Sequence, residues 1–387
     1  MVLPDETVPA GPPRAMISRA AIRHNLDLVR QAVGPGVRLC PAVKADAYGH
    51  GVAAVLPALR EAGVDIAAVA TFAEAVELRS LGWAGGILAF GRPVTGATDR
   101  EARELACEAV RHNVVCTIAT GAEAHALADA AARVGRPAIV HVKLDSGMSR
   151  AGLLPDEAAG FVRELRSMPG LRVEGVYTHF ATADEADLTF ARQQLAVFRD
   201  AVAGLDVAVR HAANSAAVFR LPESHLDMVR PGVAVYGYWP DPNQRPPVPL
   251  RPCLRLVGRL AAVKRVPKGS AVGYGRTFVA PRDSVLALVP IGYGDGYRRA
   301  LSNQAVMTLR AGTDRRAVVP VVGRVSMDQT ILDVTDVPDV REGEPVVIVD
   351  DDPDAPNSVA ATARRMNTIP YEVTCGLGRR IPRAATE

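Results

Sequence analysis

Short apolar runs alternate with amphipathic segments from about Ala15 to Tyr238. The apolar runs have the length of buried strands and occupy residues 38–43, 65–70, 86–90, 114–119, 138–144, 173–179, 207–212 and 228–230. The segments between them repeat apolar residues at helical spacing, which predicts helices over 51–62, 72–81, 101–111, 121–134, 155–168 and 189–203. Another such segment follows Ser18, a typical helix N-cap.

Strands that alternate with helices in this way favour a (β/α)8 barrel. A doubly wound sheet is the alternative, but no GxGxxG follows the first strand.

The pattern changes at a proline-rich stretch, which carries five prolines between residues 240 and 249. Such a stretch fits neither a helix nor a central strand, so residues 241–249 are expected to form a linker. Beyond it, β-branched segments separated by turn residues predict strands over 256–266, 285–291, 305–309, 317–325 and 345–349, with one helix over 358–366. We therefore expect a barrel over 14–240 and a mostly β domain over 250–387, with residues 1–13 as an N-terminal segment that packs on the β domain.

Composition narrows the class of protein. The 387 residues are 48% hydrophobic and 22% charged, as in ordinary globular enzymes. A net charge of +3 without a basic run argues against nucleic acid as a partner. The five cysteines are scattered and form no CxxC pair, which argues against a disulfide framework and a zinc site and indicates a reducing cytoplasm. The N-terminus has no apolar signal region, and no apolar run reaches about 18 residues, so neither secretion nor membrane insertion is expected.

Lysine is scarce, and its placement is informative. Only Lys44, Lys143, Lys264 and Lys268 occur, while arginine supplies most of the positive charge. Lys44 ends the first strong strand candidate. Burial favours the neutral, nucleophilic form of an amine, which a Schiff-base lysine needs. The alternative is a structural lysine whose ammonium group reaches solvent from the strand end.

Other polar residues also follow strand candidates, where barrel enzymes carry their reactive groups. Asn214 and Ser215 resemble the start of a helix that could receive a phosphate. Gly232 and Val233 offer backbone N–H donors, and Arg230 could pair with a ring nitrogen, a carboxylate or a phosphate. A Schiff-base lysine with a phosphate site indicates pyridoxal phosphate, but a Schiff-base aldolase of barrel fold would show the same residues.

Seven motifs together resemble the alanine racemase family, in the family's order across nearly the whole chain. They occupy residues 42–51, 143–150, 178–181, 213–215, 230–232, 273–275 and 323–328. The resemblance implies an N-terminal (β/α)8 barrel, a C-terminal β domain and a head-to-tail homodimer with shared active sites. It also implies pyridoxal 5'-phosphate as cofactor, L-alanine and D-alanine as substrates, and a supply of D-alanine for peptidoglycan.

The resemblance also implies residue roles. Lys44 would hold the cofactor as an aldimine and act as the base on one face of the substrate, and Tyr274 of the partner subunit would be the base on the other face. The residues implied to bind the cofactor are Lys44, Tyr48, His179, Asn214, Ser215, Arg230, Gly232, Val233 and Tyr371. Arg150 and the backbone of Met327 would bind the substrate, and Lys143 matches a lysine that many members carbamylate. Positions lining the substrate access channel would be Asp184, Arg299, Arg324 and Ile369.

Three alternatives share some of these residues. A racemase of broader or serine specificity shares the fold and both bases, although such relatives often carry a signal peptide or a membrane domain. An enzyme like D-threonine aldolase or a decarboxylase would share the lysine but lack the tyrosine between Gly273 and Gly275. A non-enzymatic pyridoxal phosphate carrier of barrel fold would lack the β domain.

Overall fold

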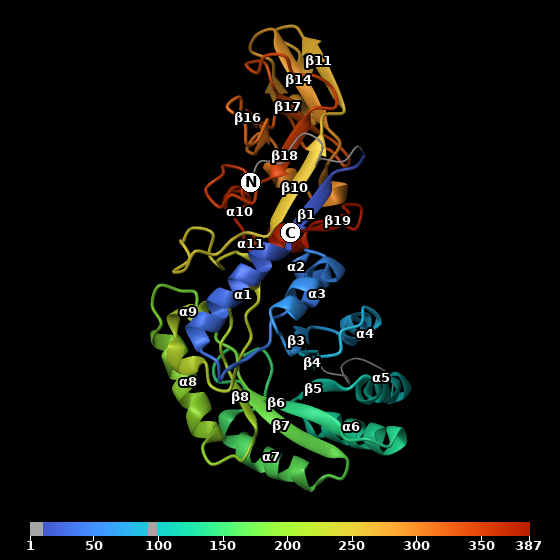
Figure 1. Ribbon diagram of the computed structural model, residues 1–387, viewed down its shortest axis with the longest axis vertical. Coiled ribbons are helices and arrows are strands. Elements are labelled where there is room, and N and C mark those ends of the chain that lie inside the picture. The colour runs from blue at the N-terminus through green and yellow to red at the C-terminus, as the bar shows by residue number, and fades with distance from the viewer. Residues whose placement is uncertain (1–10, 92–98) are drawn as a thin grey trace. The chain divides into compact units, whose positions relative to one another are not determined.

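The computed structural model describes residues 11–91 and 99–387. These residues form two compact units (Figure 1). Unit 1 contains the described parts of residues 1–24, 48–55 and 236–387, and unit 2 contains the described parts of residues 25–47 and 56–235. Within the described ranges, no helix combines the length and the apolar character that crossing a membrane requires.

Unit 2 is built on an eight-stranded parallel sheet in the order β2-β9-β8-β7-β6-β5-β4-β3. Its strands are β2 (Arg38–Leu39), β3 (Ile66–Val69), β4 (Gly86–Ala89), β5 (Val114–Ile118), β6 (Ala138–Lys143), β7 (Leu171–Tyr177), β8 (Val209–His211) and β9 (Met228–Val229). A parallel bridge between Ala42 and Ala68 links the chain after β2 to β3, so the sheet nearly closes on itself. The predicted (β/α)8 barrel is confirmed.

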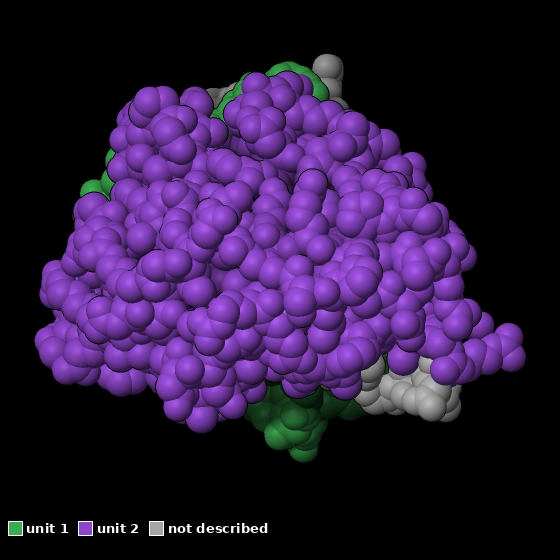
Figure 2. Space-filling view, turned by 90° about the horizontal axis from the view of Figure 1, so that it is seen from below, with its two compact units in different colours: residues 1–24, 48–55, 236–387 green, residues 25–47, 56–235 purple. Residues whose placement is uncertain are grey.

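Helices surround these strands, as Figure 1 shows for α4 to α8. They are α4 (Phe72–Ser80), α5 (Asp99–Arg111), α6 (Gly121–Val134), α7 (Ala158–Ser167), α8 (Thr189–Val202) and the short α9 (Ser215–Arg220). Apolar side chains such as Leu127 of α6 and Val140 of β6 share one buried cluster between helices and strands. Figure 2 shows one face of unit 2 as a continuous packed surface. A filled barrel leaves the ends of its strands as the places for a reactive site.

Three further helices occur before β4. α1 (Arg19–Val33) begins after Ser18, whose hydroxyl accepts the backbone N–H of Ala21 at 3.2 Å, as the sequence predicts. The short segment α2 (Lys44–Tyr48) has an unusual backbone, described below, and α3 (Val52–Glu61) follows it.

Unit 1 is mostly β structure, as predicted. Its six-stranded sheet has the order β16-β15-β18-β10-β1-β19 and contains β1 (Arg14–Ser18), β10 (Leu254–Arg259), β15 (Val306–Leu309), β16 (Ala317–Pro320), β18 (Pro345–Val349) and β19 (Arg383–Thr386). A second sheet contains β11 (Ala262–Val266), β14 (Ser284–Val289) and β17 (Thr330–Asp333), and a hairpin contains β12 (Ala271–Val272) and β13 (Phe278–Val279). The helices of this part are α10 (Val359–Met366) and α11 (Pro370–Cys375).

Some elements differ from the sequence prediction. β1 pairs with β10 and β19 in the sheet of unit 1, although the predicted barrel began at residue 14. The strand predicted over 317–325 ends at Pro320, because the chain then turns through Gly323, which has a φ of 74°. The predicted domain boundaries at 240 and 250 stay predictions, and most of the N-terminal segment 1–13 lies outside the described residues.

Candidate active site

Lys44 lies at the carboxyl end of the first barrel strand. The backbone leading to it is held between neighbouring strands, because Ala42 N donates to Pro231 O at 2.8 Å and Val43 N donates to Ala68 O at 2.8 Å. The side chain is half-buried, and its Nζ lies 5.9 Å from the ring centroid of Phe90. The amine is therefore held at the barrel mouth, where barrel enzymes carry out chemistry.

The residues after Lys44 form a left-handed turn. Ala45, Asp46, Ala47 and Tyr48 have φ angles of 52° to 56°. This conformation costs L-residues roughly 1–2 kcal/mol each, so the surrounding structure must stabilise it. The turn fixes where the chain continues after the reactive lysine.

Glu74 stabilises the start of this turn. One carboxylate oxygen accepts the backbone N–H of Ala45 at 2.6 Å, and the other accepts those of Ala70 at 2.7 Å and Thr71 at 2.8 Å. Sequence analysis missed this role. The spacing of Thr71 and Glu74 does match a capping box, which the structure forms at the start of α4, but that motif carries no sign of the bond to Ala45.

Arg230 is the buried centre of the polar network in unit 2. Its NH1 donates to His211 Nδ1 at 2.6 Å, and its NH2 lies 3.3 Å from His179 Nδ1. NH2 also donates to the carbonyl oxygens of Thr178 at 2.8 Å and Ala212 at 3.2 Å. Arg230 itself follows β9, and these contacts come from the ends of β7 and β8, so two other strands fix the guanidinium.

The chemistry of Arg230 determines the tautomers of its neighbours. A guanidinium can only donate hydrogen bonds, so Nδ1 of both His179 and His211 must be an acceptor. Both neutral rings therefore carry their hydrogen on Nε2. His211 Nε2 then donates to His141 Nδ1 at 2.8 Å, and the Nε2–H of His141 faces Glu174 Oε2 at 3.9 Å. Each hydrogen bond of this network is therefore donated in the direction that leads away from Arg230.

Burial and the nearby arginine keep these histidines neutral. Desolvation, followed by the charge of Arg230, holds the pKa of His179 and that of His211 well below the usual value. Burial lowers the pKa of His141 to about 3 and that of Arg230 to about 10. At neutral pH the arginine is thus charged and the three imidazoles are not.

A tight loop carries Arg150 towards the same strand ends. Burial alone would raise the pKa of Asp145, but its carboxylate accepts four successive backbone N–H groups of residues 147–150 at 2.8–3.0 Å, and these lower the pKa below the usual value. Ser146 Oγ lies 2.7 Å from Thr178 Oγ1, which ties the loop to the end of β7. Gly147 lies in this loop with a φ of 132°, a conformation that favours glycine.

Positive charge gathers around His179. Besides burial, the groups that lower its pKa are Arg230, Arg150, Lys143 and Lys44. These four cations all belong to unit 2, and Lys143 Nζ lies 6.0 Å from the Tyr177 ring. Such a concentration of cations favours an anionic cofactor or substrate.

Gln194 is a second residue that sequence analysis missed. It lies on α8, where its Oε1 accepts the N–H of Ala181 at 2.9 Å and its Nε2 donates to His179 O at 3.3 Å. It holds the backbone of His179 in place. A buried glutamine inside an amphipathic helix pattern was the available signal.

Ser215 and Val233 provide two hydrogen-bond donors beside Gly232, whose own N–H is already bound to Ser215. The Ser215 hydroxyl oxygen accepts the N–H of Gly232 at 2.8 Å and that of Ala234 at 3.3 Å. With both lone pairs occupied, its own hydrogen can only be donated outward. The buried N–H of Val233 has no acceptor among the residues described. Asn214 caps α9, as predicted, by accepting the N–H of Ala217 at 3.1 Å.

The remaining predicted cofactor residues belong to unit 1. The ring of Tyr48 lies 5.2 Å from that of Tyr236 and 5.7 Å from that of Tyr371, which is on α11. Burial raises the pKa of Tyr48 above the usual value, so the phenol keeps its hydrogen and can donate it. Gly49 follows Tyr48 in close contact with α11, since a Cβ there would lie 2.0 Å from Thr374 O.

Tyr274 lies on an exposed loop of unit 1. It is 73% exposed and stands between Gly273 and Gly275, whose φ angles are 69° and 71°. A cavity of about 370 Å³ is lined by Gly273, Tyr274, Arg324, Ser326, Gln329 and Ile331. The predicted base and the predicted channel residue Arg324 therefore share one surface of unit 1.

Other predicted residues of unit 1 are also exposed. Met327 is 50% exposed and Ile369 is 47% exposed, and the side chain of Arg299 faces solvent. The Met327 carbonyl accepts the N–H of Gly294 at 2.8 Å, while its own N–H has no acceptor within residues 11–91 and 99–387. Asp184 lies half-buried in unit 2, in the loop before α8.

Comparisons with known proteins give one family for both parts of the chain. The family model described as the alanine racemase N-terminal domain matches residues 17–240, and the alanine racemase C-terminal domain matches residues 253–385. An alanine racemase from Desulfovibrio desulfuricans is 40% identical over 378 residues, covering 96% of this chain and 98% of the relative. The solved alanine racemase of Clostridium difficile 630 matches with a TM-score of 0.89 and 31% identity, covering 98% of this chain and 97% of that chain. An alanine racemase from Bartonella henselae with covalently bound pyridoxal phosphate matches with a TM-score of 0.83 and 26% identity, covering 97% of this chain and 100% of that chain.

Proposed function

The chain belongs to the alanine racemase family, and from this premise we propose that it interconverts L-alanine and D-alanine. It is a pyridoxal phosphate-dependent racemase. The observation that carries the proposal is the network of Arg230, in which a donor-only guanidinium fixes the tautomer of His179 beside Lys44.

The donor set of unit 2 fits the cofactor. The outward hydrogen of Ser215 and the N–H of Val233 are donors without acceptors in the described part of the chain, and they would hold phosphate oxygens. Tyr48 and Tyr371 are proposed to add phenol donors to that phosphate. Arg230 would bind the ring nitrogen, and the Lys44 amine would bind the cofactor covalently. When bound, the cofactor withdraws electrons from the substrate α-carbon, which makes the α-proton removable.

Two bases on opposite faces would carry out the racemisation. We propose Lys44 for one face and Tyr274 of the partner subunit for the other. In either direction, one base takes the α-proton as its C–H bond breaks, and the other returns a proton as the new bond forms, so no net proton is consumed. The Nε2–H of His179 is available to donate to the phenolate of that tyrosine, and this bond would stabilise the phenolate.

Binding of the substrate carboxylate is assigned to Arg150 and the N–H of Met327. Carbamylation of Lys143 would place an anion beside Arg150 and would replace a repulsive pair of cations with an attractive one. Asp184, Arg299, Arg324 and Ile369 are proposed to line the access channel.

The cellular role follows from the reaction. We propose that a homodimer in the cytoplasm supplies D-alanine for peptidoglycan. No disulfide joins the cysteines in the described part of the chain, which suits a reducing compartment.

The test uses purified protein and chiral analysis of the product. L-alanine should yield D-alanine, whereas serine and other small amino acids should react more slowly. Lys44→Ala should abolish both activity and the visible absorbance of bound cofactor. Tyr274→Phe should slow proton transfer but keep that absorbance, and an unchanged rate in this variant would overturn the two-base assignment.

A further inference from the structure

A second charged cavity lies on unit 1 and contains none of the residues assigned to the racemase site. It has a volume of about 620 Å³, within the usual range for small-molecule sites. It lies between β10, the end of β15, the start of β18 and the loops over 311–316 and 338–344. Its charged lining residues are Arg255, Arg259, Arg310, Arg315, Arg341, Asp339, Glu342 and Glu344. Five arginines against three carboxylates give this cavity a formal charge of +2.

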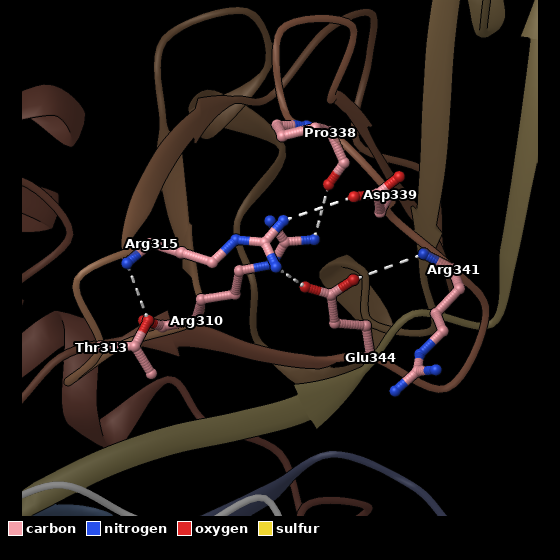
Figure 3. A network of polar contacts seen from close by, with 7 residues as sticks. All are labelled: Arg310, Thr313, Arg315, Pro338, Asp339, Arg341 and Glu344. Carbon is pink, nitrogen blue, oxygen red and sulfur yellow. Dashed lines mark hydrogen bonds and ion pairs between the residues drawn. The ribbon is translucent and has the colours of Figure 1, made fainter.

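The inner part of the cavity is rigidly held. Arg310 Nε donates to Glu344 Oε1 at 2.7 Å, and both side chains are largely buried, with 14% and 10% exposed. The second oxygen of Glu344 accepts the backbone N–H of Arg341 at 3.3 Å. Arg259 NH1 donates to Gly343 O at 2.7 Å. The loop over 339–344 is thus fixed from two sides. Figure 3 shows that the Glu344 carboxylate is already bound to Arg310.

Two guanidinium groups are held at consecutive residues of that loop. Arg310 NH2 donates to Pro338 O at 2.8 Å, and Arg315 NH2 lies 3.5 Å from Asp339 Oδ2. Both guanidinium groups line the cavity, so an anion bound there would be attracted by two positive charges. The Arg315–Asp339 pair is exposed, so it can give way to a ligand at little cost.

Arg341 is a further arginine of the cavity and lies at its exposed edge. Figure 3 shows its guanidinium turned away from Glu344. Over residues 11–91 and 99–387, that guanidinium makes neither a hydrogen bond nor an ion pair, and only the backbone of Arg341 is engaged, through its N–H and its carbonyl oxygen. Its planar fork of donors matches phosphate or carboxylate oxygens.

We propose that this arginine-lined cavity binds a small multivalent anion, a phosphorylated or polycarboxylate metabolite. The fixed arginines Arg259 and Arg310 form its floor, and the exposed arginines Arg315 and Arg341 close on the ligand. The site is distinct from the proposed racemase site, because none of its lining residues is assigned a role in racemisation.

Isothermal titration of the cofactor-loaded enzyme tests the site with two probes, pyrophosphate and citrate. Loading with cofactor fills its phosphate site and removes that source of anion binding. Saturable binding of pyrophosphate alone assigns a phosphate ligand, and binding of citrate alone assigns a polycarboxylate. Arg341→Ala and Arg315→Ala should each weaken binding about tenfold, the usual worth of one charge-assisted contact.

The double variant should lose saturable binding, and Arg341→Lys should recover part of it. The matched control is Arg245→Ala, which removes one charge from a 94% exposed side chain of unit 1 outside the cavity. It should bind like the unmodified enzyme. Failure of both probes to bind, or equal binding by the double variant, overturns the proposal.

Discussion

At the scale of single residues, Arg230 determines which nitrogen of each neighbouring histidine carries the hydrogen. It cannot accept a hydrogen bond, so each histidine it contacts must present a lone pair to it and a hydrogen on the far side. For His179 that hydrogen is the one proposed to be donated to Tyr274 of the partner subunit. For His211 it points through His141 towards Glu174. One buried cation thus determines three imidazole tautomers.

Arg230→Lys tests this arrangement. Lysine keeps the charge but has no planar fork, so it cannot hold His179, His211 and two carbonyl groups together. We expect kcat/KM for L-alanine to fall about 100-fold. Arg210→Lys is the matched control, since within the described ranges the Arg210 side chain bonds only to Val207 and Leu205 carbonyls and to Asp227. Normal catalytic efficiency in the Arg230→Lys enzyme would refute the role of the fork.

The buried histidines predict a loss of stability in mild acid. His141, His179 and His211 have lowered pKa values when folded, but in the unfolded chain they bind protons below pH of about 6.5. The unfolded state therefore gains protons as the pH falls, and stability drops. Each histidine should cost about 2 kcal/mol between pH 7 and pH 5.

Urea denaturation at several pH values measures this loss. His141→Gln keeps an acceptor for His211 and removes one of the three titrating groups, so its stability should fall less steeply between pH 7 and pH 5. His125→Gln, at an exposed position on α6, should retain the full dependence. Stability that stays constant down to pH 5 would contradict neutral buried imidazoles.

At the scale of elements, the left-handed turn after Lys44 costs conformational free energy to form. Its strain is offset locally by Glu74, whose carboxylate accepts three backbone N–H groups. Glu74→Gln retains the side-chain shape but loses the charge. We expect the free energy of unfolding to fall by roughly 1–3 kcal/mol.

The same substitution should lower kcat more than it changes KM, because it displaces the lysine rather than the substrate site. Glu77→Gln is the control, since it lies on the same helix and its carboxylate makes no hydrogen bond to the described residues of this turn. If Glu74→Gln and Glu77→Gln behave alike in thermal denaturation and in kinetics, the assigned role of Glu74 is wrong.

Sequence predicted the elements whose signal is periodic and local. The helix expected over 121–134 is α6, and the strand expected over 86–90 is β4 at Gly86–Ala89. β1 was missed because its partner β10 lies some 240 residues later, and such pairing leaves no local pattern. The left-handed turn was missed because Ala45 and Ala47 are residues that favour an ordinary helix. α11 was missed although Pro370 at its first position is a known start signal.

The site residues also divide into those that the sequence reveals and those that it does not. Lys44, Arg230 and Ser215 were recognisable because they stand at strand ends within motifs. Their geometry was not, since the tautomer of His179 depends on a contact between residues 51 positions apart. Glu74 and Gln194 act on the backbone of other residues, and nothing in the sequence marks which backbone groups they bind.

At the scale of the whole molecule, the proposed machinery is divided between two units. Lys44, Arg230 and Ser215 belong to unit 2, whereas Tyr274 and Met327 belong to unit 1. The unit 1 members are among the exposed large apolar side chains of the chain. Exposed aromatic and methionine side chains are typical of protein interfaces, which supports their proposed contribution to a second subunit's site.

Mixing two inactive variants tests whether the active site is shared between subunits. Lys44→Ala lacks one proposed base and Tyr274→Phe lacks the other, so each homodimer should be nearly inactive. In a mixed dimer, the intact Lys44 of one subunit meets the intact Tyr274 of the partner subunit, and one of the two sites is complete. Random exchange makes half of the dimers mixed, so activity should recover to about a quarter of the unmodified value. The control is a mixture of Lys44→Ala with a Lys44→Ala, Tyr274→Phe double variant, which should stay inactive. If each site instead used both residues of one chain, mixing would restore nothing at any ratio.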